Sequence, residues 1–272
     1  MKYLFIPAIL LFLSQLAAPL RAQSVETYDT IGDNLLFRKE LTGSAIIHTN
    51  GWGLEFRKGT NRSIFTKLMW EVNLLEMKDA NEIKSINQFF TNTKSYFYGK
   101  LNAVYMLRAG IGRQHMLNRK PYSGGVEIRL FYSGGVNAGF TKPVYLNILK
   151  PDNVAYRYVI VTERYDPEEH FPDNIYGRAS FFKGFNQLTF YPGAYVKVGL
   201  NVDFGTINQR PKTFEVGAVL DGFPKAIPAM AFRSPNNLFF TLYLSFGIGI
   251  RLISSGGGTR IRCSRKISEI LF

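Results

Sequence analysis

Hydrophobic and polar residues alternate along the last long apolar stretch of the chain, from Leu238 to Leu252. Successive side chains of a β-strand point to opposite faces, so this stretch has one apolar face and one small or polar face. A strand that spans a bilayer needs about 9–11 residues, whereas a spanning helix needs about 20 apolar residues. The uncharged run ends where Arg251 interrupts it, which is too short for a helix. The pattern therefore predicts a transmembrane β-strand.

Seven further segments alternate in the same way or flank a hairpin signal, which brings the expected strands to eight. The eight strands are expected at residues 41–49, 52–57, 64–76, 96–114, 126–140, 194–204, 214–220 and 238–253. Short connections alternate with long ones, as in barrels with short periplasmic turns and long external loops. Only the first external connection is tight, at the hairpin dipeptide Asn50-Gly51. We therefore expect an all-β fold, a transmembrane antiparallel up-and-down β-barrel of eight strands with long extracellular loops.

Two of the long connections have features of their own. The polar connection at 77–94 is expected to hold one helical turn near residues 82–89. The connection at 142–188 contains four prolines, and an extended hairpin arm is expected within it at 155–164. Phe181, Phe182 and Phe185 are expected to anchor a folded-back turn there. Loops of this length in compact domains are usually functional or disordered.

The N-terminus has the features of a secretory signal peptide. Lys2 precedes an apolar core, and a small residue, Ala22, ends the segment before Gln23. We expect a signal peptide at 1–22, a periplasmic lead-in at 23–40, an outer-membrane barrel at 41–253 and a basic periplasmic tail at 254–272. The one cysteine, Cys263, lies in this tail. It cannot form an internal disulfide and is a free thiol that could pair with another chain.

Composition and charge narrow the possible partners. The formal net charge is +13, and it falls to +11 when Lys2 and Arg21 leave with the signal peptide. Nothing in the chain resembles a nucleic-acid module, so nucleic acid is not expected as a partner. Basic groups near the turns favour contact with anionic lipid head groups, and docking of an acidic periplasmic partner is the alternative. The 23 Phe and 15 Tyr suit the aromatic girdles of a barrel.

The chain also resembles the small outer-membrane barrels of Bacteroidota. The residues that carry this resemblance are Tyr96 to Asn102, Lys142 to Tyr145 and Asn174 to Ala179, together with the Ala22-Gln23 junction. The resemblance covers most of the chain after the signal peptide but ends before Ser255. It implies an outer-membrane location and a barrel fold, and no activity. Some barrels of this type are subunits of outer-membrane assemblies for protein insertion or secretion, so the resemblance implies that role as a hypothesis.

The polar faces of the strands predict the interior of the barrel. They carry seven basic and six acidic side chains, a difference of +1. Charges buried in an eight-stranded barrel must pair, because its interior is just wide enough for side chains to fill. A selective pore would instead show one dominant sign or a wider barrel. We therefore expect a closed, charge-paired lumen formed by Glu55, Arg57, Lys67, Glu71, Lys100, Arg108, Glu127, Arg129, Lys197, Asp203, Glu215, Asp221 and Arg251.

Candidate catalytic and metal-binding residues are few. His48 and Ser44 share a face of the first strand, which raises a lipid-modifying enzyme as an alternative, although a lumen histidine is the favoured interpretation. His170 lies among five acidic residues, but their spacing matches no EF-hand, so a solvated loop is favoured over a Ca²⁺ site. His115 is expected to be solvated near a turn. We expect no catalytic residue, no metal and no cofactor.

The sequence thus predicts a non-enzymatic structural or accessory subunit of an outer-membrane complex. Its expected partners are outer-membrane lipid and other envelope proteins, which would contact its external loops and basic periplasmic rim. A small-solute channel is the main alternative. A lipid-modifying enzyme is the third.

Overall fold

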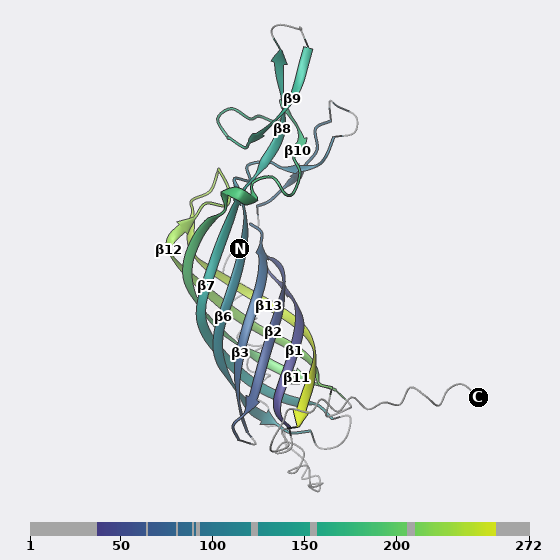
Figure 1. Ribbon diagram of the computed structural model, residues 1–272, viewed down its shortest axis with the longest axis vertical. Coiled ribbons are helices and arrows are strands. Elements are labelled where there is room, and N and C mark those ends of the chain that lie inside the picture. Colours follow the sequence, from purple (N-terminus) through teal and green to yellow (C-terminus); the bar gives the residue numbers. More distant parts are fainter. Residues whose placement is uncertain are drawn as a thin grey trace, which may run out of the picture.

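The computed structural model describes residues 37–63, 65–79, 81–88, 90, 93–120, 125–152, 157–205 and 210–253. Eight antiparallel strands close into a ring in the order β1-β13-β12-β11-β7-β6-β3-β2 (Figure 1). The expected fold class, an eight-stranded up-and-down barrel, is confirmed. The wall strands are β1 Phe37–His48, β2 Gly51–Asn61, β3 Thr66–Met77, β6 Asn102–Asn118, β7 Glu127–Pro143, β11 Thr189–Asp203, β12 Lys212–Ile227 and β13 Asn236–Ile253.

The first hairpin and the start of the barrel differ from the expectation. Strand β1 begins at Phe37, so residues 37–40 belong to the wall and not to a periplasmic lead-in. Glu40 pairs with Gly59 of β2 and with Arg251 of β13, which supplies backbone partners on both sides. The hairpin turn consists of Thr49 and Asn50, one position earlier than expected, because Gly51 already pairs with His48.

The wall is tall on one side and low on the other. Strands β6, β7, β11, β12 and β13 have 15 to 18 residues, whereas β1, β2 and β3 have 11 or 12. The expected strand at 96–114 is wrong at its first part, because the wall strand starts only at Asn102. Residues Tyr96–Phe97 form the short strand β5, which pairs with β4, Lys84–Ser85. Lys84 and Ser85 are therefore extended, whereas the sequence predicted one helical turn near residues 82–89.

The long connection after β7 folds into a second small sheet beyond the barrel (Figure 1). Strand β8, Tyr145–Asp152, pairs on one side with β9, Arg157–Arg164, and on the other with β10, Ile175–Arg178. We call these three strands the external sheet. The expected hairpin arm is therefore found from Arg157 onward, and Ala155 lies outside the described residues. Buried Leu146, Ile148 and Ile175 pack with Tyr96 and Tyr165 beneath the sheet.

The two faces of the barrel wall have opposite chemistry. Outward positions carry large apolar side chains that are half or more exposed, among them Trp52, Leu54, Trp70, Leu74, Val136, Val196, Leu242 and Ile250. Inward positions of the same strands carry buried polar and charged side chains. A barrel folded in water would place these groups the other way round, since burial of apolar area is the driving force there. Among the described residues, no helix is long and apolar enough to cross a bilayer.

One connection closes the mouth of the barrel on the side of the external sheet. Residues 228–231, between β12 and β13, reach across the ring to the start of β6. The amides of Leu101 and Asn102 donate to the carbonyl of Ala229, and the amide of Ala231 donates to the carbonyl of Gly99. Strands β11 and β7 separate β12 from β6 in the ring, so these bonds cross the opening.

Residues 1–36 and 254–272 lie outside the described part of the chain. The expected signal peptide, most of the lead-in, the basic tail and Cys263 therefore remain predictions from the sequence.

Candidate functional site: the charge-paired interior

The centre of the barrel holds two cations among three carboxylates. Glu55 and Arg57 lie two residues apart on β2 and therefore share its inward face, while Glu71, Lys197 and Glu215 come from β3, β11 and β12. Lys197 Nζ lies 2.7 Å from Glu55 Oε1 and 3.4 Å from Glu215 Oε1. Arg57 donates to Glu55 Oε1 at 2.6 Å and to Glu215 Oε2 at 2.7 Å. These bonds tie opposite sides of the ring together.

Neutral side chains add further hydrogen bonds to this central cluster. The hydroxyls of Tyr195 and Ser133 donate to Glu71 Oε1 at 2.8 and 2.6 Å. The hydroxyl of Tyr243 donates in the same way to a second carboxylate, Glu215, at Oε1 and 2.8 Å. The Phe131 ring lies beside both cations, with its centroid 5.2 Å from the Arg57 guanidinium carbon and 5.4 Å from Lys197 Nζ. The charges are thus enclosed by rings and hydroxyls that leave little room for a water column.

A second ion pair lies between the centre and the mouth. Arg108 of β6 donates twice to Asp221 of β12, from Nε at 2.7 Å and from Nη2 at 2.5 Å. Asn137 of β7 adds a bond to Asp221 Oδ1 at 2.7 Å. A two-pronged arginine–carboxylate contact has fixed geometry and is among the stronger hydrogen-bonded pairs in proteins. It links two strands on opposite sides of the ring.

A third group closes the barrel near the short turns. Glu40 accepts from Lys67 and from Arg251, both at 2.8 Å, and Arg251 also donates to Asp203 at 2.6 Å. Lys120 reaches in from the turn after β6 and donates to Asp203 at 3.1 Å. Arg129 and Glu127 form a separate pair on the inward face of β7. Charged hydrogen bonds therefore occupy the lumen at three levels, and those of the first two levels join strands on opposite sides of the ring.

The structure places twelve of the thirteen expected lumen residues on the inward face of the wall. Lys100 is the exception, because it precedes β6 at the mouth and pairs there with Glu82 at 2.7 Å. Sequence reasoning also missed Glu40, which alternation with Thr42 and Ser44 could have revealed. With Glu40 included, six inward basic groups face seven acidic ones among the described wall residues, and Lys120 balances the sum.

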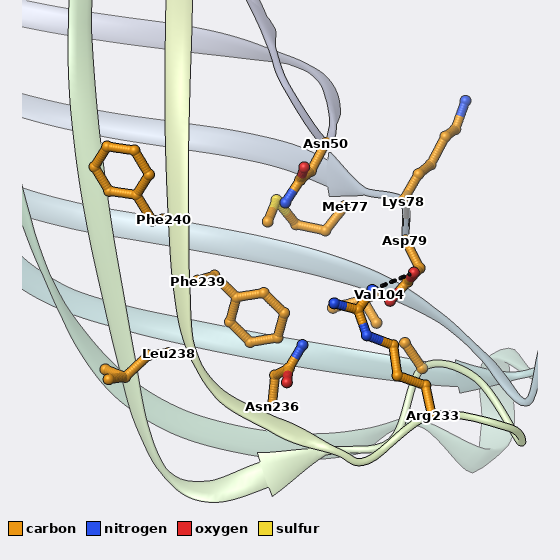
Figure 2. A pocket seen from close by; sticks show the side chains of 11 residues that line it. Asn50, Met77, Lys78, Asp79, Val104, Arg233, Asn236, Leu238, Phe239 and Phe240 are labelled. Carbon is orange, nitrogen blue, oxygen red and sulfur yellow. Dashed lines mark hydrogen bonds and ion pairs between the residues drawn. The ribbon is translucent and has the colours of Figure 1, made fainter. Parts of the chain in front are cut away.

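Above these charges the interior becomes apolar. Leu75, Val104, Met106, Phe223 and Ile227 are buried together beneath the mouth. A pocket of about 220 Å³ opens at the rim above them, between the start of β13 and the end of β3 (Figure 2). Phe239, Met77 and Val104 form its apolar floor, and Arg233 bonds to Asp79 at its edge at 2.8 Å.

This pocket is smaller than ordinary small-molecule sites, which occupy about 300–1,000 Å³. Its apolar floor separates it from the charged clusters below. It is therefore a shallow vestibule at the mouth of a filled barrel.

The histidines considered as catalytic or metal-binding candidates contact other protein groups in the structure. His48 is buried on the inward face of β1, and its Nδ1 accepts from the amide of Asn50 at 3.3 Å. No hydrogen bond joins it to Ser44 in the described part of the chain. His115 stacks on the Tyr132 ring with centroids 5.7 Å apart. Among the described residues, no cluster of three or more His, Cys, Asp or Glu is placed to hold a metal.

His170 is buried at the base of the external sheet, contrary to the solvated loop expected there. Its Nδ1 accepts from the Asp166 amide at 2.9 Å, and its Nε2 lies 3.5 Å from Glu163. Glu163 also accepts from Lys150 at 2.8 Å, and this bond holds the pKa of the Glu163 carboxyl below its ordinary value. Burial next to Tyr98 raises the pKa of the Tyr165 hydroxyl to about 12. These contacts make the base of the sheet a folded unit.

No protein-family model and no curated protein matches the chain. Solved structures of outer-membrane barrels are similar at low identity. Neisserial surface protein A has a TM-score of 0.39 and 8% identity, over 79% of this chain and 96% of that chain. The attachment invasion locus protein Ail of Yersinia pestis has a TM-score of 0.34 and 8% identity, over 79% and 99%. The N-terminal β-barrel domain of Pseudomonas aeruginosa OprF has a TM-score of 0.33 and 9% identity, over 78% and 96%. Similarities at this level carry no information about function.

Proposed function

We propose that the protein is a non-conducting barrel of the outer membrane that anchors the external sheet and serves as a structural or accessory subunit of an envelope complex. Protein insertion or secretion machinery is the type of complex that we favour. In this proposal the chain binds lipid through its outward face and a protein partner through the external sheet. It carries out no catalysis.

The membrane location is supported by the outward face of the wall. Leu54, Leu74, Val196, Leu242 and Ile250 are large apolar side chains that no other part of the described chain covers. Closed barrels satisfy all backbone hydrogen bonds between strands, which a bilayer requires. A strand-built spanning protein with one apolar face per strand suits the outer membrane of a Gram-negative envelope.

The filled interior is the observation that carries the proposal. Five charged side chains, two tyrosines and a phenylalanine occupy the centre of the lumen and are all nearly inaccessible. Their bonds run between strands on opposite sides of the ring, so a solute could pass only by breaking several of them at once. Residues 228–231 cover the mouth above. Conduction would need a wider or less bonded interior.

The external sheet supplies a surface for a partner. Strand β9 pairs with β8 on one side, and among the described residues nothing pairs with its other edge. Tyr158, Val159 and Ile160 of β9 are exposed there, Tyr158 by 73%. An open apolar edge strand is a template for a strand from another chain. We therefore propose that the partner adds an extended segment to β9.

A photo-crosslinking amino acid tests this partner surface in intact cells. Placed at Tyr158, it should give one protein adduct of defined mass, because this exposed side chain belongs to the edge strand that would pair with the partner. The same amino acid at Val136, on the outward face of β7, is the matched control and should meet lipid alone. Adducts at neither Tyr158 nor Ile160, with the barrel correctly assembled, would contradict the partner role.

A further inference from the structure

A cluster of exposed phenylalanines lies beside the mouth of the barrel. Phe181, Phe182 and Phe185 are 59%, 79% and 41% exposed, and their rings contact one another at centroid distances of 5.5 to 6.4 Å. They belong to residues 180–187, which end in a short 3₁₀ helix, η1, Phe185–Gln187. We call residues 180–187 the aromatic turn. Exposed apolar clusters of this kind mark contact sites for lipid or protein.

A lysine of the barrel wall holds the aromatic turn in place. Lys142 Nζ donates to the Phe181 carbonyl at 2.5 Å and lies 4.0 and 4.6 Å from the centroids of the Phe181 and Phe185 rings. Gly184 has a φ of 90°, and a Cβ there would come within 2.9 Å of the Pro143 carbonyl oxygen. The turn is therefore built against the end of β7.

The position of Lys142 shows that the aromatic turn sits on the outer side of the wall. Thr141 and Pro143 lie at inward-facing positions in the alternation of β7, so Lys142 between them lies at an outward-facing position. Its side chain is nevertheless buried, and the residue is only 6% exposed. A lysine facing lipid is unfavourable unless its charge is covered. Here the phenylalanine rings cover the ammonium group through their π faces, and their other faces remain open.

The open faces continue the apolar outward face of the barrel. The chain leaves the aromatic turn through exposed Leu188 into β11, where Phe190 packs on Phe140 of β7 with centroids 5.6 Å apart. Val196 and Val198 extend the same outward face along β11. Leu188 and Phe190 thus join the aromatic turn to the surface that faces lipid.

From this continuity we infer that the aromatic turn lies in the interfacial layer of the membrane and contacts lipid with Phe181, Phe182 and Phe185. Aromatic rings favour the boundary between head groups and acyl chains. The neighbouring Lys183, which is exposed, suits the anionic head-group level. Because β8 follows Pro143 by one residue, the lipid contact also braces the external sheet against the membrane. The inference rests on the proposed membrane location of the barrel.

Depth-dependent fluorescence quenching tests whether the aromatic turn contacts lipid. The full chain with Cys263→Ser receives one cysteine labelled with an environment-sensitive nitrobenzoxadiazole dye, at Phe182, Val198 or Thr162. The labelled proteins are reconstituted at high lipid excess in phosphatidylethanolamine–phosphatidylglycerol vesicles with a spin label either near the head groups or deep in the acyl chains. Phe185→Cys replaces Phe182→Cys if the latter fails to assemble, as judged by heat-dependent mobility on gels.

The three positions separate the possible outcomes. The dye at position 182 should have blue-shifted emission and lose more of it to the shallow quencher than to the deep one. The dye at 198 should be quenched strongly by the deep label, and the dye at 162 by neither. A dye at 182 that behaves like the one at 162 would overturn the inference and leave the barrel location intact. Blue-shifted emission at 182 without quenching would also overturn it, since protein would then cover the rings. An unquenched dye at 198 would refute the proposed membrane location itself.

Discussion

Lys197 and Glu55 are 142 positions apart in the chain, yet the lysine Nζ lies 2.7 Å from the glutamate Oε1 at the centre of the barrel. Strands β11 and β2, which carry them, lie on opposite sides of the ring. Both side chains are almost fully shielded from solvent. Such a pair offers weak net stability over an apolar core, but removal of one partner leaves an uncompensated buried charge. The pair therefore acts as a cross-tie, an ion pair that links opposite sides of the barrel, and removal of one partner should destabilise the fold.

Replacement of Lys197 by methionine should destabilise the folded barrel strongly. Glu55, Glu71 and Glu215 would then share Arg57 as their remaining central cation, and a broken buried pair typically costs about 3–5 kcal/mol. Urea unfolding of the protein in lipid vesicles, followed by loss of the heat-resistant band on gels, measures the change. Lys212→Met is the matched control: Lys212 is exposed at the start of β12, so its loss should change stability by within about 0.5 kcal/mol. Equal effects of the two variants would refute the cross-tie.

Removal of the Tyr195 hydroxyl should weaken the same cluster without opening a cavity. Tyr195→Phe keeps the ring but deletes the bond to Glu71, and a hydrogen bond to a charged group contributes about 1.5–3 kcal/mol. The matched control is Tyr132→Phe, on the outward face, where the hydroxyl meets His115 at 3.2 Å. The same unfolding assay should find the control near wild type. A harmless Tyr195→Phe would mean that Glu71 does not depend on this donor.

The first hairpin offers a test of backbone geometry. Gly51 has a φ of 145°, and an added Cβ would collide with the Glu76 carbonyl of β3, so Gly51→Ala should cost about 1–3 kcal/mol. Gly43, on β1, has open space within 4 Å of where its Cβ would lie. Gly43→Ala should therefore leave unfolding almost unchanged. If both alanine variants unfolded alike, the tight Thr49–Asn50 turn would be wrong.

Acid should loosen the base of the external sheet. The Lys150 bond, and then the His170 contact, hold the pKa of Glu163 below its ordinary value of 4.5 in the folded state. A carboxyl with a lowered folded-state pKa stabilises the fold above its unfolded-state pKa, and that stability is lost as the pH falls through the folded-state value. Hydrogen exchange of β8 and β9 amides should therefore quicken, relative to the barrel, as the pH falls below about 4.

Glu163→Gln isolates this effect. The variant should exchange faster than wild type at neutral pH, and the acid-induced difference between the sheet and the barrel should be smaller. The wall strand β12 serves as the internal reference, because Glu163 does not contact it. An unchanged pH response in Glu163→Gln would show that another group controls the base of the sheet.

The barrel fold could be predicted because alternation survives in a single sequence. Each wall strand has lipid on one side and the packed interior on the other. Apolar and polar residues therefore alternate with a period of two, most clearly from Leu238 to Leu252. The same alternation assigned Lys197, Glu215 and Arg251 to the inward face. It could not reveal which charges meet, since contacts across the ring depend on the stagger of eight strands.

Three features of the structure were not predicted from the sequence. Glu40 was missed because polar Arg38 and Lys39 before it hide the start of β1, although Glu40, Thr42 and Ser44 share its inward phase. Lys100 was misplaced because the alternation from Tyr96 runs unbroken into β6, while the loop at 228–231 bonds to this segment. The external sheet depends on the pairing of β10 with β8. Residues 157–174, which include β9, separate these two strands in the chain, and alternation within one strand does not show which distant strand it pairs with.

Single-channel recording from the pure protein in planar bilayers tests the closed interior most directly. Before recording, the heat-dependent gel shift should establish that the barrel is folded. We predict a silent baseline at all applied voltages, because charged hydrogen bonds occupy the lumen at three levels and residues 228–231 cover its mouth. Sustained, ohmic current steps from the wild-type protein would contradict the closed interior and, with it, the role as a non-conducting anchor.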